Sequence, residues 1–99
     1  MKELNIANFE EEVSKAKLAV IDFWAPWCGP CRMQGPILED FAMDRPDVSV
    51  FKVNVDSEPA LAKAFGVMSI PTLVIYKDGK MINKAVGLHS AEDIEDLLG

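Results

Sequence analysis

Two cysteines, Cys28 and Cys31, have the type and spacing in this chain that most directly allow chemistry. Residues three apart on a helical turn lie about 5–6 Å from each other, and a disulfide can bridge that separation. A helix is expected to begin at Cys28, so free N–H groups and the helix dipole would stabilise its thiolate. The spacing therefore predicts a dithiol that opens and closes, in which Cys28 attacks a disulfide and Cys31 then releases the reduced product.

Two other uses of the cysteine pair stay open at this point. A zinc ion needs four ligands, and the chain adds only one histidine, His89, to its two cysteines. Cysteines are also often buried for packing alone, although Gly29-Pro30 between the pair and the helix start after it argue against inert side chains. We therefore expect a redox dithiol with no metal and no bound cofactor.

Asp22 is the other residue whose position indicates chemistry. It lies in the run Leu18–Trp24, which is otherwise apolar and is typical of a central strand covered on both faces. Burial without a cation partner raises the pKa of a carboxyl group, and such a group can take a proton from a neighbouring thiol, directly or through a water. The alternative is an exposed acid at a strand end, because Asp is almost never fully buried unpaired.

The elements that must position these residues follow from hydrophobic periodicity and from turn and cap residues. Asn8 with Glu11 and Ser90 with Asp93 have the pattern of a helix capping box, and Asp78-Gly79 has that of a hairpin turn. The patterns predict strands over residues 3–6, 18–24, 48–55, 72–77 and 81–86, and helices over residues 8–15, 31–44, 57–66 and from 90 onward.

This order predicts an α/β fold with a central mixed five-stranded sheet, a short first strand and four helices on both faces. We expect residues 1–99 to form a single domain, because the length fits one domain. Sheets of this kind place function beyond the carboxyl ends of their strands. The chain leaves its central strand and runs straight into Trp27-Cys28, so the dithiol is expected at that edge.

Composition and charge restrict the classes of partner that this protein is expected to bind and the compartment in which it is expected to work. The formal net charge is −6, which argues against nucleic acid or an anionic membrane surface as the main partner. No apolar run approaches the roughly 20 residues that span a bilayer, and Met1–Asn5 lacks the apolar segment of a secretory signal. We therefore expect a cytoplasmic protein, in a compartment where structural disulfides are rare.

Three segments make the sequence recognisable. Phe23–Cys31 (FWAPWCGPC), Met68–Thr72 (MSIPT) and Val86-Gly87 resemble the thioredoxin family over essentially the whole chain. The resemblance implies a thioredoxin-like fold and a general protein-disulfide reductase that works through a mixed disulfide. It also implies client proteins that carry disulfides, and a separate reductase that regenerates the dithiol.

The resemblance further assigns roles near the dithiol. Asp22 is expected to deprotonate Cys31, and Lys52 matches a family lysine beside that acid. Gly29, Pro30 and Lys52 are expected to tune the redox chemistry. For Lys52 the alternative is an ordinary solvated lysine, because strands alternate faces.

The resemblance also implies a client groove around Cys28, formed by Trp27, Ile70, Pro71, Val86 and Gly87. It implies a cis peptide bond before Pro71, whereas the rarity of cis X-Pro bonds in folded proteins alone predicts trans. A cis bond would leave the Ile70 backbone free to pair with an extended client segment. Gly87, without a Cβ, allows another backbone to come near, and Trp27 has plain core packing as its alternative.

Other functions remain in competition. A disulfide-forming or isomerising protein would use the same chemistry, but relatives with that role tend to carry His before the second cysteine, where this chain has Pro30. A binding module without redox activity and a metal-binding regulator are the alternatives from other classes. The favoured function is a monomeric reductase of disulfides in other proteins, acting as an electron carrier in redox homeostasis.

Overall fold

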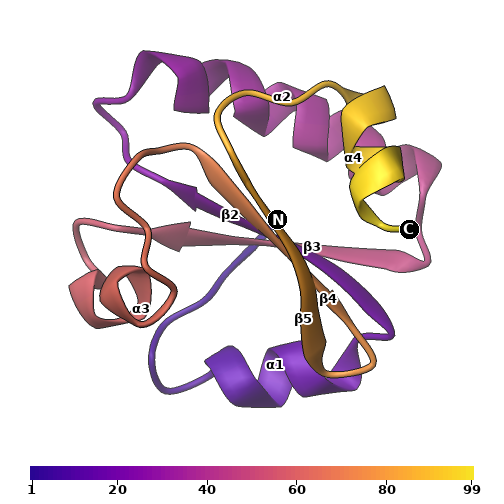
Figure 1. Ribbon diagram of the computed structural model, residues 1–99, viewed down its shortest axis with the longest axis horizontal. Helices are drawn as coiled ribbons and strands as arrows, with labels where there is room; N and C mark the ends of the chain where they lie inside the picture. Colours follow the sequence, from indigo (N-terminus) through magenta and orange to yellow (C-terminus); the bar gives the residue numbers. More distant parts are fainter.

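The computed structural model describes residues 1–99 as five strands and four helices arranged around one sheet (Figure 1). The strands are β1 (Lys2–Glu3), β2 (Leu18–Trp24), β3 (Val48–Asn54), β4 (Thr72–Lys77) and β5 (Lys80–Val86). The helices are α1 (Phe9–Lys15), α2 (Gly29–Asp44), α3 (Pro59–Ala64) and α4 (Ala91–Leu97). None of the four is both long and apolar enough to cross a membrane.

The sheet has the order β1-β3-β2-β4-β5, so β2 lies at its centre. β1 and β2 run parallel to β3, whereas β4 is antiparallel to both β2 and β5. This is the expected mixed five-stranded sheet of a thioredoxin-like fold. β5 pairs only with β4, and all of its residues except the half-buried Ala85 are exposed.

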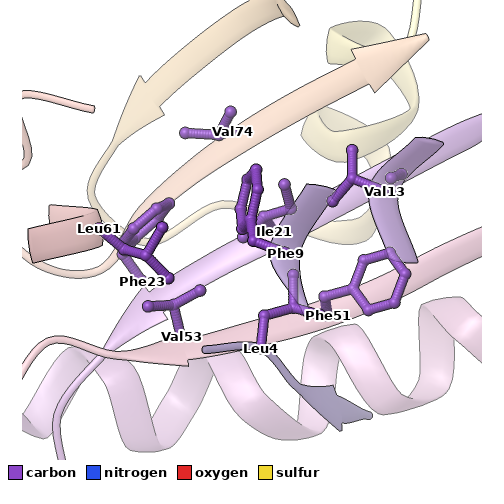
Figure 2. Packing of buried hydrophobic residues seen from close by; sticks show 10 residues of the cluster. Leu4, Phe9, Val13, Ile21, Phe23, Phe51, Val53, Leu61 and Val74 are labelled. Carbon is purple, nitrogen blue, oxygen red and sulfur yellow. The ribbon is translucent and has the colours of Figure 1, made fainter. Parts of the chain in front are cut away.

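Each face of the sheet is covered by two helices. α1 and α3 bury an apolar cluster on one face, which includes Phe9, Phe23 and Leu61 (Figure 2). α2 and α4 bury a second cluster on the other face, which includes Leu38 and Ile94. Complete burial of one such side chain stabilises the fold by about 1.5–3 kcal/mol. Alternation along β2 directs Ile21 and Phe23 to the first face and Asp22 to the face that α2 covers.

The first strand differs from the prediction. It occupies Lys2–Glu3 instead of residues 3–6, and only the N–H of Leu4 continues the pairing, to the carbonyl of Lys52. Asn5 ends the strand because its side-chain oxygen accepts hydrogen bonds from the backbone N–H groups of Ala7 and Asn8. This side-chain turn competes with the ladder and redirects the chain toward α1.

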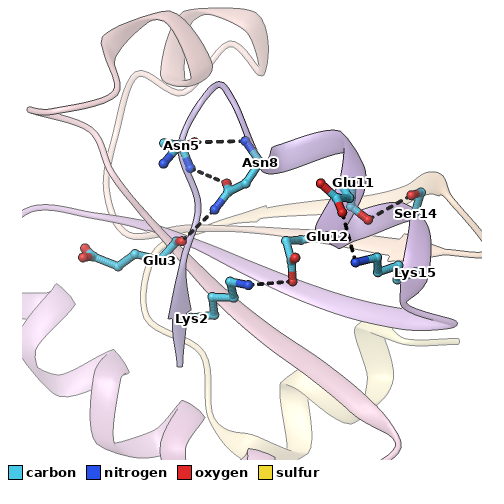
Figure 3. Close-up of polar contacts among 8 residues, drawn as sticks. All are labelled: Lys2, Glu3, Asn5, Asn8, Glu11, Glu12, Ser14 and Lys15. Carbon is cyan, nitrogen blue, oxygen red and sulfur yellow. Dashed lines mark hydrogen bonds and ion pairs between the residues drawn. The ribbon is translucent and has the colours of Figure 1, made fainter.

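The expected capping box at the start of α1 was wrong. The Asn8 side chain accepts a hydrogen bond from the N–H of Asn5 and makes none to the first turn of the helix (Figure 3). Glu11 bonds to Lys15 and, through its carbonyl, to Ser14 instead of to Asn8. The two asparagines thus satisfy each other, and the helix begins without a side-chain cap.

Two other local predictions are confirmed. Ser90 and Asp93 form a reciprocal capping box at α4, in which each side chain accepts from the other's N–H. Asp78 and Gly79 have φ values of 51° and 78° between β4 and β5. The two-residue hairpin turn that Asp-Gly favours requires positive φ at both of these positions. β5 therefore returns along β4 with Lys77 opposite Lys80.

Candidate active site

The cysteine pair lies at the carboxyl end of β2, where the chain turns into α2. Cys28 and Cys31 form a disulfide with their Cα atoms 5.2 Å apart, and each is 5% exposed. α2 begins at Gly29, two residues earlier than predicted, because Cys28 occupies the N-cap position. Pro30 lies in the first turn, where the N–H that it lacks has no helical partner in any case.

The N-cap geometry determines the surroundings of the Cys28 sulfur. Its Sγ accepts a hydrogen bond from the backbone N–H of Cys31 at 3.2 Å. The first turn of α2 contains no acidic residue, so no negative charge offsets the positive end of the helix dipole. A backbone donor and the dipole both favour the ionised form of a thiol at this position.

Asp22 lies beneath the disulfide on β2 and is 2% exposed. Burial raises the pKa of this carboxyl group to about 7, and the charge of Lys52 lowers it by a smaller amount. The Oδ1 atom of Asp22 has no hydrogen-bond partner. The structure therefore excludes the exposed-acid alternative and leaves a buried carboxyl close to its titration point at neutral pH.

Lys52 is half-buried and lies directly opposite Asp22 in the β2–β3 register. Its Nζ lies 5.1 Å from the centre of the Trp24 ring, within the range of a cation–π contact. The lysine is thus held beside the acid, as the resemblance implied, and it is not a freely solvated side chain.

A cavity of about 160 Å³ joins the acid to the second cysteine. Asp22, Trp24, Cys31 and Lys52 line it, together with Met1, Arg32, Gly35 and Glu39. The unpartnered Oδ1 of Asp22 and the unpartnered Nε1 of Trp24 are both polar groups that water can satisfy. Because one water takes about 30 Å³ in the liquid, the cavity has room for a bridge between Asp22 and Cys31.

The expected groove residues lie on the outer side of the dithiol. The Ile70-Pro71 bond is cis, and the Ile70 carbonyl oxygen is 3.7 Å from the Cys28 sulfur. The N–H of Gly87 donates to the Pro71 carbonyl at 2.7 Å, so the end of β5 is tied to the same loop. Val86 is 60% exposed beside it. Both the backbone and the side chain of Ile70 therefore lie against the dithiol, and Val86 and Gly87 join this surface through Thr72 and Pro71.

Trp27 belongs to this surface and not to the core. Its side chain is 64% exposed, and its Nε1 donates to Oδ2 of Asp56 at 2.9 Å. The core-packing alternative was therefore wrong. A large ring held in place by one hydrogen bond offers apolar area next to the dithiol at little cost in side-chain entropy.

Comparison with known proteins agrees with this geometry. The family model described as Thioredoxin matches residues 1–99. The chain belongs to the thioredoxin family. The chain is 45% identical over 93 residues to a thioredoxin of Alicyclobacillus acidocaldarius, an alignment that covers 93% of this chain and 89% of the relative. It is 42% identical over 99 residues to a thioredoxin of Listeria monocytogenes, covering 99% and 95% of the two chains.

Solved structures of the family have the same architecture. Mitochondrial thioredoxin 3 from Saccharomyces cerevisiae, in its oxidized form, superposes with a TM-score of 0.91 at 36% identity, over 99% of this chain and 92% of that one. The thioredoxin of Fasciola hepatica superposes with a TM-score of 0.90 at 35% identity, over 98% and 96% of the two chains.

Thioredoxins are disulfide oxidoreductases that act as dithiol electron carriers. With its Cys28–Cys31 pair, this member of the thioredoxin family is a thiol-disulfide oxidoreductase. Its partners are, in general terms, proteins that contain disulfides and a reductase. No three His, Cys, Asp or Glu side chains gather anywhere in the structure as metal ligands do.

A second, larger hollow lies away from this chemistry. It measures about 760 Å³ between α1 and α3, and its lining includes Phe9, Phe65 and Tyr76. It contains no thiol and none of the site residues expected from the thioredoxin family. The smaller cavity is the one that brings a cysteine of the redox pair and a titratable acid together.

Sequence reasoning missed Gln34, which is fully buried one turn after Cys31 on α2. A polar residue on a helix is normally assigned to the solvent face, so its type hid its position. Its spacing was the available signal, because Cys31, Gln34, Leu38 and Phe41 recur on one face of α2.

Proposed function

We propose that the chain is a general protein-disulfide reductase in which Cys28 is the attacking thiol. Its thiolate attacks one sulfur of the client disulfide, which forms a mixed disulfide and releases the other client sulfur as a thiolate. Cys31 then attacks the Cys28 sulfur, which re-forms the Cys28–Cys31 disulfide and releases the second client thiol. Two electrons pass to the client. The hydrogen bond from the Cys31 N–H to the Cys28 sulfur is the observation that carries this assignment.

The second step requires Cys31 to lose its proton, and we propose Asp22 as the base. The raised pKa of Asp22, about 7, suits a group that exchanges protons at neutral pH. The cavity that both residues line supports a transfer through water. Lys52 favours the ionised carboxylate and so opposes the effect of burial.

The client is proposed to bind as an extended segment against Trp27, Ile70, Pro71, Val86 and Gly87. Support comes from the exposure of Trp27 and Val86 and from the short distance between the Ile70 carbonyl and the Cys28 sulfur. Backbone pairing tolerates many side chains, which suits a reductase with many clients.

The dipeptide between the cysteines supports the proposed direction of electron flow. Gly29 and Pro30 carry no charge, so they add nothing to the stabilisation of the Cys28 thiolate by the helix. Because extra stabilisation of the reduced form is what makes a dithiol a strong oxidant, this pair favours a reductant. An oxidase or isomerase is the function that this argument disfavours.

The setting is proposed to be the cytoplasm, with a separate reductase that completes an electron-transport cycle. Both cysteines of the chain belong to the redox pair, so no structural disulfide calls for an oxidising compartment. We propose that residues 1–99 act as a single domain and a monomer. The net charge of −6 supports protein clients over nucleic acid.

The deciding experiment is the redox equilibrium of the pair in graded dithiothreitol and glutathione buffers, followed by thiol labelling. We expect a reversible two-electron transition with a midpoint below the potential of the glutathione pool, which is about −240 mV. A Cys31→Ser variant should accumulate a mixed disulfide with the client, and a Cys28→Ser variant should form none. A midpoint above the pool would indicate an oxidase or isomerase, and the lack of any transition would indicate a binding module.

A further inference from the structure

Gln34 is a buried amide in an apolar row of side chains. It is 0% exposed on α2, and the other buried members of its row are Cys31, Leu38 and Phe41. An unpaired amide at such a position is strongly unfavourable, so its partners indicate why it is there. The nitrogen and the oxygen of the amide both form hydrogen bonds with one residue of a distant loop.

That residue is His89, in the loop between β5 and α4. The Nε2 of Gln34 donates to the His89 carbonyl at 3.0 Å, and the His89 N–H donates to the Gln34 Oε1 at 2.8 Å. The amide thus pairs with both the N–H and the carbonyl of His89, as a residue in a neighbouring strand would. In Figure 1 this loop runs from β5 along α2 before it enters α4.

The pair with Gln34 continues into the proposed client groove. His89 Nδ1 lies 2.7 Å from the Gly87 carbonyl, and the Gly87 N–H donates to the Pro71 carbonyl at 2.7 Å. Hydrogen bonds therefore run from the helix that carries the dithiol, through this loop, to the cis-proline. Gly87 lies within that series, and Val86 precedes it at the end of β5.

Apolar packing does not hold this loop. No side chain from Val86 to Asp93 is buried, and the first buried residue after the loop is Ile94. Gly87, with φ of 97°, is in a conformation that gives little stiffness of its own. The hydrogen bonds that join this loop directly to α2 are therefore the two of Gln34.

We infer that Gln34 is a positioning residue, which fixes the Gly87–His89 loop against the helix that carries the dithiol and so sets the shape of the client groove. The inference rests on the proposed client groove. Without the tie Leu88 and His89 are free to move away from α2, and Gly87 keeps only its bond to Pro71, so a client loses part of a preorganised wall. The cysteines and Asp22 are untouched, so the redox chemistry itself does not change.

The test compares two substrates of the reduced protein in stopped flow: insulin as a protein disulfide, and 5,5′-dithiobis(2-nitrobenzoate) as a small one. In Gln34→Met, which keeps the volume and removes both hydrogen bonds, we expect the half-saturating insulin concentration to rise about fivefold. The maximal rate, the rate with the small disulfide and the midpoint potential should stay at the values of the unmodified protein. His89→Ala removes only the ring contact with Gly87 and should raise half-saturation about twofold.

Matched controls separate this role from plain stability. Ile94→Val loosens the packing of α4 without touching the polar tie, and it should leave both substrates unaffected. Exchange of the His89 amide proton, measured in each variant, reports whether the tie is broken. If Gln34→Met fails to fold, Gln34→Asn takes its place, because its shorter side chain keeps an amide but cannot reach both backbone groups of His89.

The outcomes distinguish the two proposals. A selective rise in half-saturation for insulin supports the inference. Unchanged insulin kinetics with a freely exchanging His89 amide would overturn it, as would an equal loss with both substrates. Val86→Asp tests the groove by itself. If this variant leaves insulin binding unchanged, the proposed groove fails. If Val86→Asp weakens insulin binding and Gln34→Met does not, the groove stands and only the role of Gln34 fails.

Discussion

The cavity beneath the dithiol and the loop beside it each depend on one buried polar side chain, and the two side chains are held in opposite ways. Asp22 is 2% exposed and leaves Oδ1 without a partner, whereas Gln34 is 0% exposed and uses both ends of its amide. The unpaired carboxyl keeps a raised pKa and is able to exchange a proton. The paired amide cannot titrate, and its hydrogen bonds only fix geometry. In the roles that we propose, burial thus serves chemistry in one region and shape in the other.

The largest expected effect that tests this contrast is on stability against pH. Folding raises the pKa of Asp22 from 3.8 to about 7, so the folded protein binds more protons than the unfolded chain between these values. Stability should therefore fall as pH rises from about 4 to 7, by up to about 4 kcal/mol, and then level off. Urea unfolding of the oxidised protein at several pH values measures this.

Asp22→Asn should abolish that slope, because the amide resembles the protonated acid and does not titrate. Asp47 does not produce such a slope. Arg45 lowers the pKa of Asp47, so the stability that Asp47 contributes is lost only as pH falls below this range. An equal slope in Asp22→Asn would show that another group is responsible.

The next effect is kinetic. Asp22→Asn should slow the release of the mixed disulfide about a hundredfold, because Cys31 loses its base. The first attack by Cys28 should keep its rate, so the mixed disulfide accumulates and can be trapped by acid quench. Asp40→Asn, the same change at an exposed site on α2, should affect neither step. Equal slowing of both steps would assign Asp22 a different role.

The smallest effect concerns Gly35, which lies next to Gln34 and lines the cavity with Asp22. A Cβ at this position would meet nothing within 4 Å, and the residue lies inside α2. Gly35→Ala should therefore raise the free energy of unfolding by about 0.5–1 kcal/mol, measured by urea titration. The same change at Gly79, with φ of 78°, should lower it. A loss at both positions would mean that the cavity needs the glycine.

Local signals explain what the sequence could predict. The apolar run of β2, the Asp78-Gly79 turn and the capping box of Ser90 each depend on neighbours along the chain, and all three are confirmed. The dithiol belongs to the same class, because the three-residue spacing already places both cysteines on one turn. The burial of Asp22 followed from the strand that contains it.

Predictions failed where residues compete for the same partners or meet across the chain. Asn5 and Asn8 are both able to cap a helix or a turn, and only their mutual hydrogen bonds decide between the two. Gln34 finds its partners 55 residues away, in backbone atoms that no side-chain pattern reveals. Trp27 is exposed as expected, but the hydrogen bond that joins its ring nitrogen to Asp56 is a contact that apolar periodicity does not encode.

The open edge of the sheet affects how readily the protein associates with itself at high salt. β5 presents one side without a neighbouring strand, and its side chains Met81, Ile82 and Val86 are exposed. Lysines discourage strand pairing at such edges, but Lys84 already donates to the carbonyls of Phe65 and Gly66 at the end of α3. Lys84 keeps its positive charge there, but its ammonium group is held at α3, so Lys80 is the lysine of β5 whose ammonium group has no hydrogen-bond partner. Because about 1 M salt shortens the reach of charge to about 3 Å, self-association of this chain in concentrated brine would begin at β5.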